Sequence, residues 1–418
     1  MPRSYPDAGP PVGPGASPSP GTGLSAPRLF LAVVLVTLNL RAAITSVPPL
    51  VVTIQAALGI SGAMAGALTA LPVLCMGVFA PLAARLAHRI GREAAVAVAL
   101  VVLTAGLLVR LGGDHLAVLF VGALLGGIGI AVCGTLLPGI IKDYFPHKAG
   151  VMTGVYMFSM TIGAATASGL SVPLAQLLGG WPRALSAWAL VAVLGLLGWV
   201  PVLGAARAAR AGRRESQGDA APSAAARQHL PWRSRTAWAV AAYLATMSWQ
   251  FYSQVAWLAP AYEAHGWSAA SAGLLVAGYQ LAQLLSGVGG PALTQRVRDR
   301  RALLWPAVAL MLLALLGLTL APDAAPWLWT VVLGLGVGGG FAVGLVLLVD
   351  YADTPAAAAR LTAMVFSVSY TVASIGPTAF GAVRDATGGF ATPWASLAAL
   401  AAVQLLLIVP LRPDLPSP

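Results

Sequence analysis

An arginine lies in the middle of a long apolar run. The run is LVTLNLRAAITSVPPL, residues 35–50, and the guanidinium of Arg41 within it stays charged at physiological pH. Insertion scales put the cost of an arginine at the centre of a bilayer at about 2.5 to 3.5 kcal/mol. Thr37, Arg41, Thr45 and Pro48 recur at helical spacing and form one polar stripe. A polar stripe on an otherwise apolar helix predicts that the helix faces a cavity.

The apolar runs offer Arg41 no acidic partner, because all thirteen Asp and Glu residues map to tails, loops or the ends of runs. A guanidinium presents a rigid fork of donors that suits a planar carboxylate or a linear triatomic anion. We therefore expect an anionic or strongly dipolar cargo to supply the missing partner. One alternative stays open, in which Arg41 snorkels or binds carbonyl groups at a helix break near Pro48 and Pro49.

Polar and aromatic side chains on neighbouring runs are candidates for the same cavity. Tyr and Trp can donate hydrogen bonds to an anion while their rings exclude water and limit the volume. The predicted substrate-binding residues are Arg41, Asn39, Thr45, Tyr156, Ser159, Trp249, Gln250, Tyr252, Gln254, Tyr279, Gln283, Phe366 and Tyr370. For each aromatic residue taken singly, packing between helices is the alternative interpretation.

The elements that must position these residues are membrane-spanning helices. Of the 418 residues, 58% are hydrophobic and 9% are charged, whereas soluble proteins carry about 25% charged residues. A helix needs about 20 apolar residues to cross the hydrocarbon, and lipid leaves only helices or closed barrels as options. The sequence therefore predicts an all-α membrane protein with twelve transmembrane helices. Their approximate spans are 29–55, 62–88, 94–111, 116–141, 150–178, 183–204, 236–262, 270–294, 302–321, 326–350, 361–384 and 392–411.

Basic residues lie mainly on one side of the predicted helices. That side carries Arg85, Arg89, Arg92, Lys142, Lys148, the cluster from Arg207 to Arg235, Arg296, Arg298, Arg300, Arg301 and Arg360. The other side shows Arg110, Arg183 and Arg384. The positive-inside rule therefore predicts that both termini are cytoplasmic, and the membrane is expected to be a bacterial inner membrane. On this interpretation the net charge of +11 reflects topology and not binding to nucleic acid.

The chain is predicted to repeat itself as two halves. A shift of 210 residues aligns Ser159 with Ser369, and a shift of 211 aligns Arg41 with Tyr252 and Asn39 with Gln250. Two six-helix halves around a central cavity form a transporter architecture with the site near the midplane. The predicted divisions are a disordered cytoplasmic tail at 1–27, a six-helix bundle at 28–204, a basic linker at 205–235, a second bundle at 236–412 and a tail at 413–418.

This layout resembles the major facilitator superfamily. The loop ARLAHRIGRE, residues 84–93, is similar to the signature between the second and third helices of that superfamily. The resemblance implies a gating set that comprises Arg85, His88, Arg89, Gly91, Arg92 and Asp299. The sequence departs from the superfamily pattern at His88, Glu93 and Ala123, where the superfamily usually has Asp, a basic residue and Arg.

Within the superfamily, three stretches together resemble the branch of cyanate and nitroimidazole permeases. They are LNLRAAITSVPPL, FYSQVAWLAPAYEAHGWS and MVFSVSYTVASIGPTAFGAVRDATGGF. This branch covers substrates of different chemistry, so the resemblance leaves the cargo open.

These observations predict a secondary active transporter that moves a small anion, such as a cyanate-like or nitrite-like ion or a small carboxylate, by alternating access. The sequence has no ATP-binding motif, so a gradient is expected to drive it. Two alternatives stay open: an exporter of neutral heteroaromatic compounds such as nitroimidazoles, and a membrane sensor that does not transport. The residues predict no enzyme activity, no metal and no cofactor, and the resemblance implies a monomer.

Overall fold

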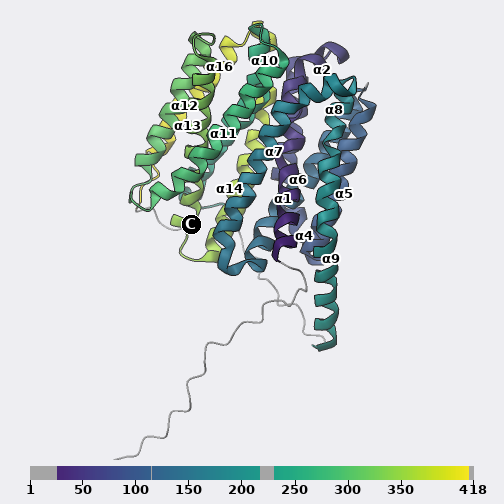
Figure 1. Cartoon of the computed structure of the whole chain (residues 1–418). Coiled ribbons are helices and arrows are strands. Elements are labelled where there is room, and N and C mark those ends of the chain that lie inside the picture. The colour runs from purple at the N-terminus through teal and green to yellow at the C-terminus, as the bar shows by residue number, and fades with distance from the viewer. Residues whose placement is uncertain (1–25, 114, 217–229, 414–418) are drawn as a thin grey trace, which may run out of the picture.

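The computed structural model describes residues 26–113, 115–216 and 230–413, and every regular element within them is a helix. Most of the predicted N-terminal tail, the middle of the predicted linker and most of the C-terminal tail lie outside these residues. The first half contains α1 (Ala26–Thr45), η1 (Pro48–Leu50), α2 (Val51–Leu58), α3 (Gly62–Val78), α4 (Ala80–Ile90), α5 (Arg92–Val109), η2 (Arg110–Gly112), α6 (Leu116–Tyr144), η3 (Pro146–Lys148), α7 (Ala149–Leu178), α8 (Trp181–Ala187) and α9 (Ala189–Ser216). The second half contains α10 (Arg235–Ala264), α11 (Ala269–Thr294), α12 (Arg301–Leu320), α13 (Pro326–Asp350), α14 (Pro355–Ala373), α15 (Ile375–Thr387) and α16 (Ala391–Ile408) (Figure 1).

Most of these helices are long and apolar enough to cross a membrane. By length and composition ten helices of the described chain qualify, or eleven when the bent pair α3 and α4 counts as one span. The remaining predicted span corresponds to α10, which has 30 residues but carries buried polar residues such as Ser248, Gln250 and Gln254. The prediction of an all-α, multi-span membrane protein is confirmed.

Proline residues divide the first two predicted spans. Helix α1 ends at Thr45, and Pro48 and Pro49 form the short turn η1 before α2 begins. Pro81 lies in the first turn of α4, where its missing amide would be unsatisfied anyway, and α4 bends away from α3 by 55°. The break after α1 leaves the last carbonyl groups of that helix in need of other hydrogen-bond donors.

The two halves repeat the same helix pairings. In the first half α1 packs on α7, and α5 packs on α6 and α9. In the second half α10 packs on α14, and α12 packs on α13 and α16. In both halves these pairs join the first span with the fifth and the third span with the fourth and sixth. The pairings agree with two pseudo-symmetric six-helix halves, while the limits 28–204 and 236–412 stay predictions. Helix α9 continues to Ser216, inside the predicted linker.

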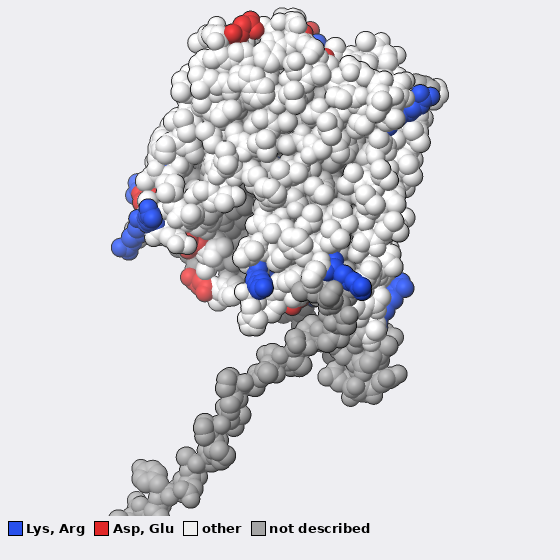
Figure 2. Space-filling model, in the orientation of Figure 1, with Lys and Arg blue, Asp and Glu red and all other residues white. Residues whose placement is uncertain are grey.

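Both ends of the described chain lie at the same end of the molecule, the lower end in Figure 1. Lys and Arg side chains gather toward this end in Figure 2. Its exposed cations include Arg85, Arg89, Lys142 and Arg298, and we name it the basic end. The positive-inside rule predicts that the basic end faces the cytoplasm.

The two halves meet most closely at the end opposite the basic end. There α3 packs along α15 and α7 packs along α11. A Cβ atom at Gly66 would lie 2.2 Å from the carbonyl oxygen of Pro377, and one at Gly273 would lie 2.6 Å from that of Ser168. At the basic end, by contrast, Gly154 of α7 has open space beside it, and the surface between the halves is recessed (Figure 2). The molecule is therefore sealed at one end and more open toward the basic end.

Candidate functional site

Arg41 of α1 lies half-buried where the two halves meet. Its Nη1 donates a hydrogen bond of 3.1 Å to Oε1 of Gln283 on α11, in the other half. Its guanidinium carbon lies 4.7 Å from the ring centre of Phe251 on α10, in a cation–π contact. Among the residues that the structure describes, no carboxylate oxygen lies within 4 Å of Arg41. An amide oxygen and a ring face therefore contact this charge in place of a resident acid.

A small cavity opens beside the guanidinium. Its volume is about 20 Å³, which is enough for about one water-sized group. The lining consists of Arg41, Ser248, Phe251, Tyr252, Gln283, Val337, Phe341 and Tyr370. Arg41 comes from the first half, and the other lining residues come from α10, α11, α13 and α14. The cavity therefore spans the junction of the halves.

Four tyrosines are close enough to Arg41 to interact with it electrostatically. They are Tyr156, Tyr252, Tyr279 and Tyr370. The ring centres of Tyr252 and Tyr370 lie 6.4 Å apart, and those of Tyr252 and Phe251 lie 4.8 Å apart. Phe366 extends this aromatic group, because it stacks on Tyr370 at 5.6 Å. The site thus places hydroxyl groups and apolar ring faces around one permanent charge.

Two of the predicted amides tether helices and do not line the cavity. Asn39 Nδ2 donates a 3.1 Å hydrogen bond to the carbonyl oxygen of Val191 on α9. Gln250 Nε2 donates a 2.7 Å hydrogen bond to the carbonyl oxygen of Leu397 on α16. The 211-residue shift aligns Asn39 with Gln250, and α9 and α16 are the sixth spans of their halves. The duplicated sequence therefore repeats a tether between the first and sixth spans.

Three other predicted polar residues are also hydrogen-bonded within the protein. The hydroxyl of Tyr279 donates to Gln254 Oε1 at 2.9 Å, and Gln254 Nε2 donates to Gln250 Oε1 at 3.2 Å. Thr45 Oγ1 donates to the carbonyl oxygen of Ala164 on α7 at 3.1 Å. These bonds hold α11 on α10 and α7 on α1. The three side chains therefore support the helices that carry the cavity lining.

The remaining predicted residues lie on helices next to the cavity. Tyr156 and Ser159 are buried on α7, about one turn apart. Trp249 lies where α10 meets α15, since a Cβ atom at Gly376 would come within 3.1 Å of its ring. Of the predicted set, the cavity lining includes Arg41, Tyr252, Gln283 and Tyr370.

Sequence reasoning missed four lining residues, which are Ser248, Phe251, Val337 and Phe341. Ser248 lies one turn before Tyr252, and Phe251 directly precedes it. Val337 and Phe341 are one turn apart, so they share a face of α13. Helical spacing was the available signal for all four residues, but spacing does not tell which neighbouring helix a face meets.

Arg110, at the end of the predicted span 94–111, is a buried arginine of the first half. It is 3% exposed, and its Nη1 donates a 3.2 Å hydrogen bond to the carbonyl oxygen of Ala43. Ala43 lies in the last turn of α1, where a carbonyl lacks a partner within the helix and attracts a cation. Gly122 of α6 gives the side chain room, since a Cβ atom there would lie 2.9 Å from Arg110 Cγ. Binding carbonyl groups at the helix break, which was the alternative role for Arg41, is therefore the observed role of Arg110.

The predicted gating residues lie at the basic end. Arg85, His88 and Arg89 are exposed on α4. Gly91 joins α4 to α5 at φ +92°, a conformation that strains any residue with a Cβ atom. Arg92 pairs with Asp143 at the end of α6.

Asp299 is the last residue of the predicted gating set, and it forms an ion pair with Arg301, two residues further along the chain. Arg301 Nη2 donates to Asp299 Oδ2 at 2.7 Å, and this guanidinium holds the pKa of Asp299 below its usual range. A second pair joins Arg300 to Asp350 at 2.7 Å. Each ion pair found among residues 26–113, 115–216 and 230–413 lies within one half. At the basic end these pairs therefore do not tie the two halves together.

The sealed end carries a polar connection between the halves. Asp385, at the end of α15, accepts hydrogen bonds of 2.9 Å from the backbone nitrogens of both Gly62 and Ala63 at the start of α3. These amides are unsatisfied donors of the helix, and a carboxylate there also complements the helix dipole. The neighbouring Arg384 donates to Gln55 Oε1 at 3.4 Å. Asp385 and Arg384 together link the second half to α2 and α3 of the first.

The arrangement offers hydrogen bonding and charge pairing, without a metal centre among the described residues. Within the described part of the chain, no group of three or more His, Cys, Asp and Glu side chains could hold a metal ion. The site instead offers one guanidinium, an amide and several hydroxyl groups at a junction between two bodies.

Comparison with known proteins places the chain among transporters. The Major Facilitator Superfamily profile matches residues 29–377. The chain is 37% identical over 368 residues to the "Uncharacterized transporter YycB" of Bacillus subtilis (strain 168), which covers 87% of this chain and 88% of that protein. It is 33% identical over 373 residues to the 2-nitroimidazole transporter of Escherichia coli (strain K12), with 89% and 92% covered. It is 31% identical over 380 residues to the cyanate transport protein CynX of the same organism, with 91% and 96% covered.

Solved structures show the same fold at low sequence identity. The D-xylose-proton symporter superposes with a TM-score of 0.73 at 15% identity, over 94% of this chain and 99% of that chain. The inward open conformation of the xylose transporter XylE from E. coli superposes with a TM-score of 0.71 at 13% identity, over 91% and 95% of the two chains. The relatives in sequence and in fold are transporters and not enzymes. The chain belongs to the Major Facilitator Superfamily, and its sequence is similar to the cyanate and 2-nitroimidazole transporters of that superfamily.

Proposed function

We propose that this protein is a gradient-driven transporter of a small anion, and that the anion pairs with Arg41 during transport. The observation that carries the proposal is the position of Arg41. It presents a permanent charge to a cavity at the junction of the halves, and its contacts are Gln283 and Phe251 and not an acid. A carboxylate or a linear anion would accept hydrogen bonds from both arms of the guanidinium.

The size of the cavity favours a cargo of few atoms. A volume of about 20 Å³ is far below the range of about 300 to 1,000 Å³ that is typical of sites for drug-sized ligands. Rings of Phe251, Tyr252 and Tyr370 close around the guanidinium, so a large cargo would have to displace them. The name of the cyanate transport protein, which is 31% identical to the chain, supports the same class of cargo.

We propose that transport occurs by alternating access across a bacterial inner membrane, with the basic end and both termini in the cytoplasm and with one chain as the working unit. The halves are sealed at the end opposite the basic end and have their ion pairs within each half at the basic end. Rocking of the two halves would then expose Arg41 to each side in turn. Such a cycle needs no covalent chemistry.

Export of a neutral heteroaromatic compound is the second candidate. The aromatic group around Arg41, together with 33% identity to a 2-nitroimidazole transporter, favours it. In that case stacking of the rings on the cargo would supply most of the affinity, and Arg41 would only polarise a nitro group.

Ligand-induced thermal stabilisation of the purified protein separates these two functions. The panel contains cyanate, nitrite, nitrate, short carboxylates and 2-nitroimidazole, and the proteins are wild type, Arg41→Gln, Arg41→Lys and Arg298→Gln. A ligand at 100 times its Kd stabilises the folded state by about 2.7 kcal/mol. We expect an anion to stabilise wild type and the exposed-arginine control Arg298→Gln, and to have little effect on Arg41→Gln.

The Arg41→Lys variant tests the geometry of pairing, because lysine keeps the charge and loses the fork of donors. A strongly reduced stabilisation by the anion is expected. Equal stabilisation of all four proteins by 2-nitroimidazole, with no response to anions, would instead assign the protein to export of heteroaromatic compounds.

A further inference from the structure

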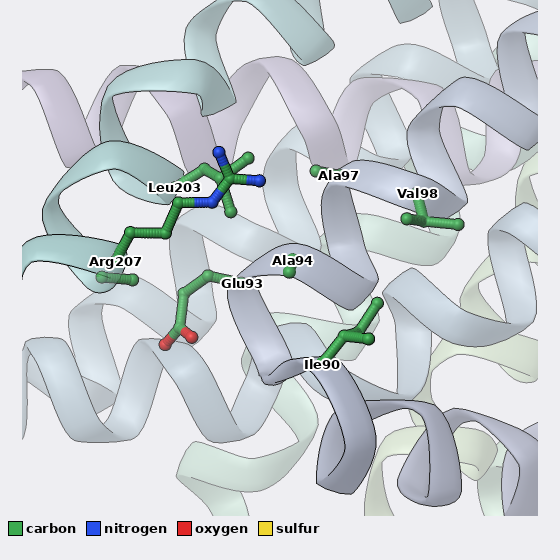
Figure 3. Close-up of a pocket in the computed structure, with 8 residues that line it drawn as sticks. Ile90, Glu93, Ala94, Ala97, Val98, Leu203 and Arg207 are labelled. Atoms are coloured by element: carbon green, nitrogen blue, oxygen red, sulfur yellow. The ribbon is translucent and has the colours of Figure 1, made fainter. Parts of the chain in front are cut away.

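A groove lies on the outside of the first half, at the basic end and away from the central cavity. Its volume is about 310 Å³. Figure 3 shows its walls, which come from the start of α5, from the part of α9 that runs beside it and from Ile90 at the end of α4. The lining consists of Ile90, Glu93, Ala94, Ala97, Val98, Leu203, Ala206 and Arg207.

Small side chains keep this groove open. Ala94 and Ala97 of α5 and Ala206 of α9 line it, and they leave space that longer side chains would fill. Trp199 of α9 is fully buried next to the groove, and its Nε1 donates a 2.9 Å hydrogen bond to the carbonyl oxygen of Glu93. This bond fixes α9 on α5, so the two walls are held at a set separation.

The groove lies where the lipid-facing surface meets the basic end. Further along α5, toward the opposite end, Val101 is 53% exposed, and along α9 Leu197 is 59% exposed and Val200 is 55% exposed. Large apolar side chains with this exposure on a membrane protein face lipid tails. Arg207 follows Val200 by two helical turns, or about 10 Å. We therefore expect Val200 to lie at the level of the lipid tails and Arg207 to lie at the level of the phospholipid headgroups.

Two charged side chains line the groove, Arg207 and Glu93, and they point in different directions. Arg207 is exposed, and no carboxylate oxygen lies within 4 Å of it among the described residues. Glu93 is 7% exposed, and its Oε1 accepts a hydrogen bond of 3.4 Å from the hydroxyl of Tyr144. The Glu93 carboxylate points away from the Arg207 guanidinium in Figure 3. The nearby Arg92 is paired with Asp143, and among the described side chains that line the groove Arg207 is the cation.

We propose that this groove binds an anionic phospholipid, with one acyl chain between α5 and α9 and the lipid phosphate paired with Arg207. The apolar walls suit a hydrocarbon chain, and the guanidinium suits a phosphate group. The exposed apolar side chains beyond the groove would contact the rest of the chain. This site is separate from the Arg41 cavity and does not depend on the identity of the transported substrate.

Native mass spectrometry of the detergent-purified protein tests the proposal. The protein is titrated with phosphatidylglycerol or with phosphatidylcholine of identical acyl chains, as wild type, Arg207→Gln, Ala97→Leu and Arg298→Gln. Arg207→Gln removes the phosphate contact and Ala97→Leu fills the groove. Arg298→Gln removes an exposed arginine of the other half and serves as the matched control.

We expect wild type and Arg298→Gln to retain one phosphatidylglycerol more tightly than phosphatidylcholine. Arg207→Gln should bind phosphatidylglycerol about fivefold more weakly, which is the effect of one basic residue at an anionic lipid surface, and should lose the preference between the two lipids. Ala97→Leu should bind both lipids weakly. Unchanged lipid preference in Arg207→Gln would overturn the proposal, and so would a dimer that disappears in Ala97→Leu, because a second copy of the chain would then occupy the groove.

Discussion

At the scale of single residues, the half-buried Arg41 and the buried Arg110 of the first half have different tasks. Arg110 donates to the carbonyl oxygen of Ala43 at the end of α1, which lacks a partner within the helix and otherwise accepts only a 3.5 Å hydrogen bond from Ser46 Oγ. Arg41 faces a cavity and contacts an amide and a ring of the other half. One charge therefore completes the fold, and the other is available to a ligand.

Replacement of Arg110 by glutamine should destabilise the protein. The shorter side chain removes the 3.2 Å bond to the Ala43 carbonyl and leaves it only the longer 3.5 Å hydrogen bond from Ser46 Oγ, and loss of such a buried hydrogen bond costs about 1 to 3 kcal/mol. Thermal unfolding in detergent would show a lower Tm for Arg110→Gln than for Arg41→Gln. The exposed Arg183→Gln at the same end of the molecule is the control. A Tm for Arg110→Gln equal to that of the control would exclude the structural role.

Replacement of Gln283 by glutamate should block anion binding. The new carboxylate would stand 3.1 Å from Arg41 Nη1, in the position of the amide oxygen, and would serve as a permanent counter-ion. We expect Gln283→Glu to lose the stabilisation that the anion gives to wild type, while its own Tm does not fall. Gln283→Leu removes the hydrogen bond without adding a charge and should keep most of the response. A full response to the anion in Gln283→Glu would contradict pairing at Arg41.

At the scale of helices, the contact of α3 with α15 holds one end of the molecule closed. Glycines at positions 62, 66 and 381 bring the two backbones together. The carboxylate of Asp385 then completes the first turn of a helix that belongs to the other half. For this closed end to open, the two hydrogen bonds of Asp385 must break.

Replacement of Asp385 by asparagine should favour opening of that end. The amide removes the charge that complements the α3 dipole, which is worth about 0.3 to 1 kcal/mol at an exposed helix end, or up to about fivefold in the ratio of open to closed molecules. Spin labels at Ala57 of α2 and Ala391 of α16, with Cys75 and Cys133 replaced by alanine, report the distance across this end. Double electron–electron resonance should show a larger long-distance population in Asp385→Asn.

Asp323→Asn is the matched control for this measurement. Asp323 is an exposed acid that pairs with His265 of its own half at 3.0 Å. The substitution therefore removes one negative charge, as Asp385→Asn does, and leaves the contacts between the halves unchanged. An identical distance distribution in Asp385→Asn and Asp323→Asn would show that the Asp385 bonds do not hold the end closed.

At the scale of the whole molecule, the balance between closed and open arrangements depends on what the junction buries. Gln280 of α11 is fully buried, and within the described chain neither Oε1 nor Nε2 has a hydrogen-bond partner. The most extensive packing between the two halves is that of α11 on α7. A buried amide without partners costs about 1 to 3 kcal/mol, so it destabilises this arrangement relative to one in which the amide is hydrogen-bonded.

Replacement of Gln280 by leucine should therefore stabilise the observed arrangement. Gln280→Leu keeps a similar volume and removes the unsatisfied amide, so we expect a higher Tm. The same spin labels should show a larger short-distance population, and uptake into liposomes should be slower because the cycle must leave a more stable state. Gln280→Asn keeps the amide and is the control. A lower Tm in Gln280→Leu would show that the amide stabilises this arrangement.

The sequence by itself determined the class of the protein and its central charge. Apolar runs of about 20 residues, the basic residues on one side and the internal duplication are local or additive properties, so they can be read without coordinates. The position of Arg41 within such a run, on a polar stripe, also belongs to one helix. Pro48 and Pro49 likewise marked the break between α1 and α2.

Only the tertiary structure decided which polar residues meet around Arg41. Asn39 and Gln250 are close to Arg41 and Tyr252 in sequence, yet they reach Val191 and Leu397 on the sixth spans. Helical spacing fixes which residues share a face, but the rotation of each helix against its neighbours fixes what that face meets. That rotation comes from packing of side chains far apart in sequence. The same packing brought Phe251 and Phe341 to the cavity and buried Arg110 against α1 and α6.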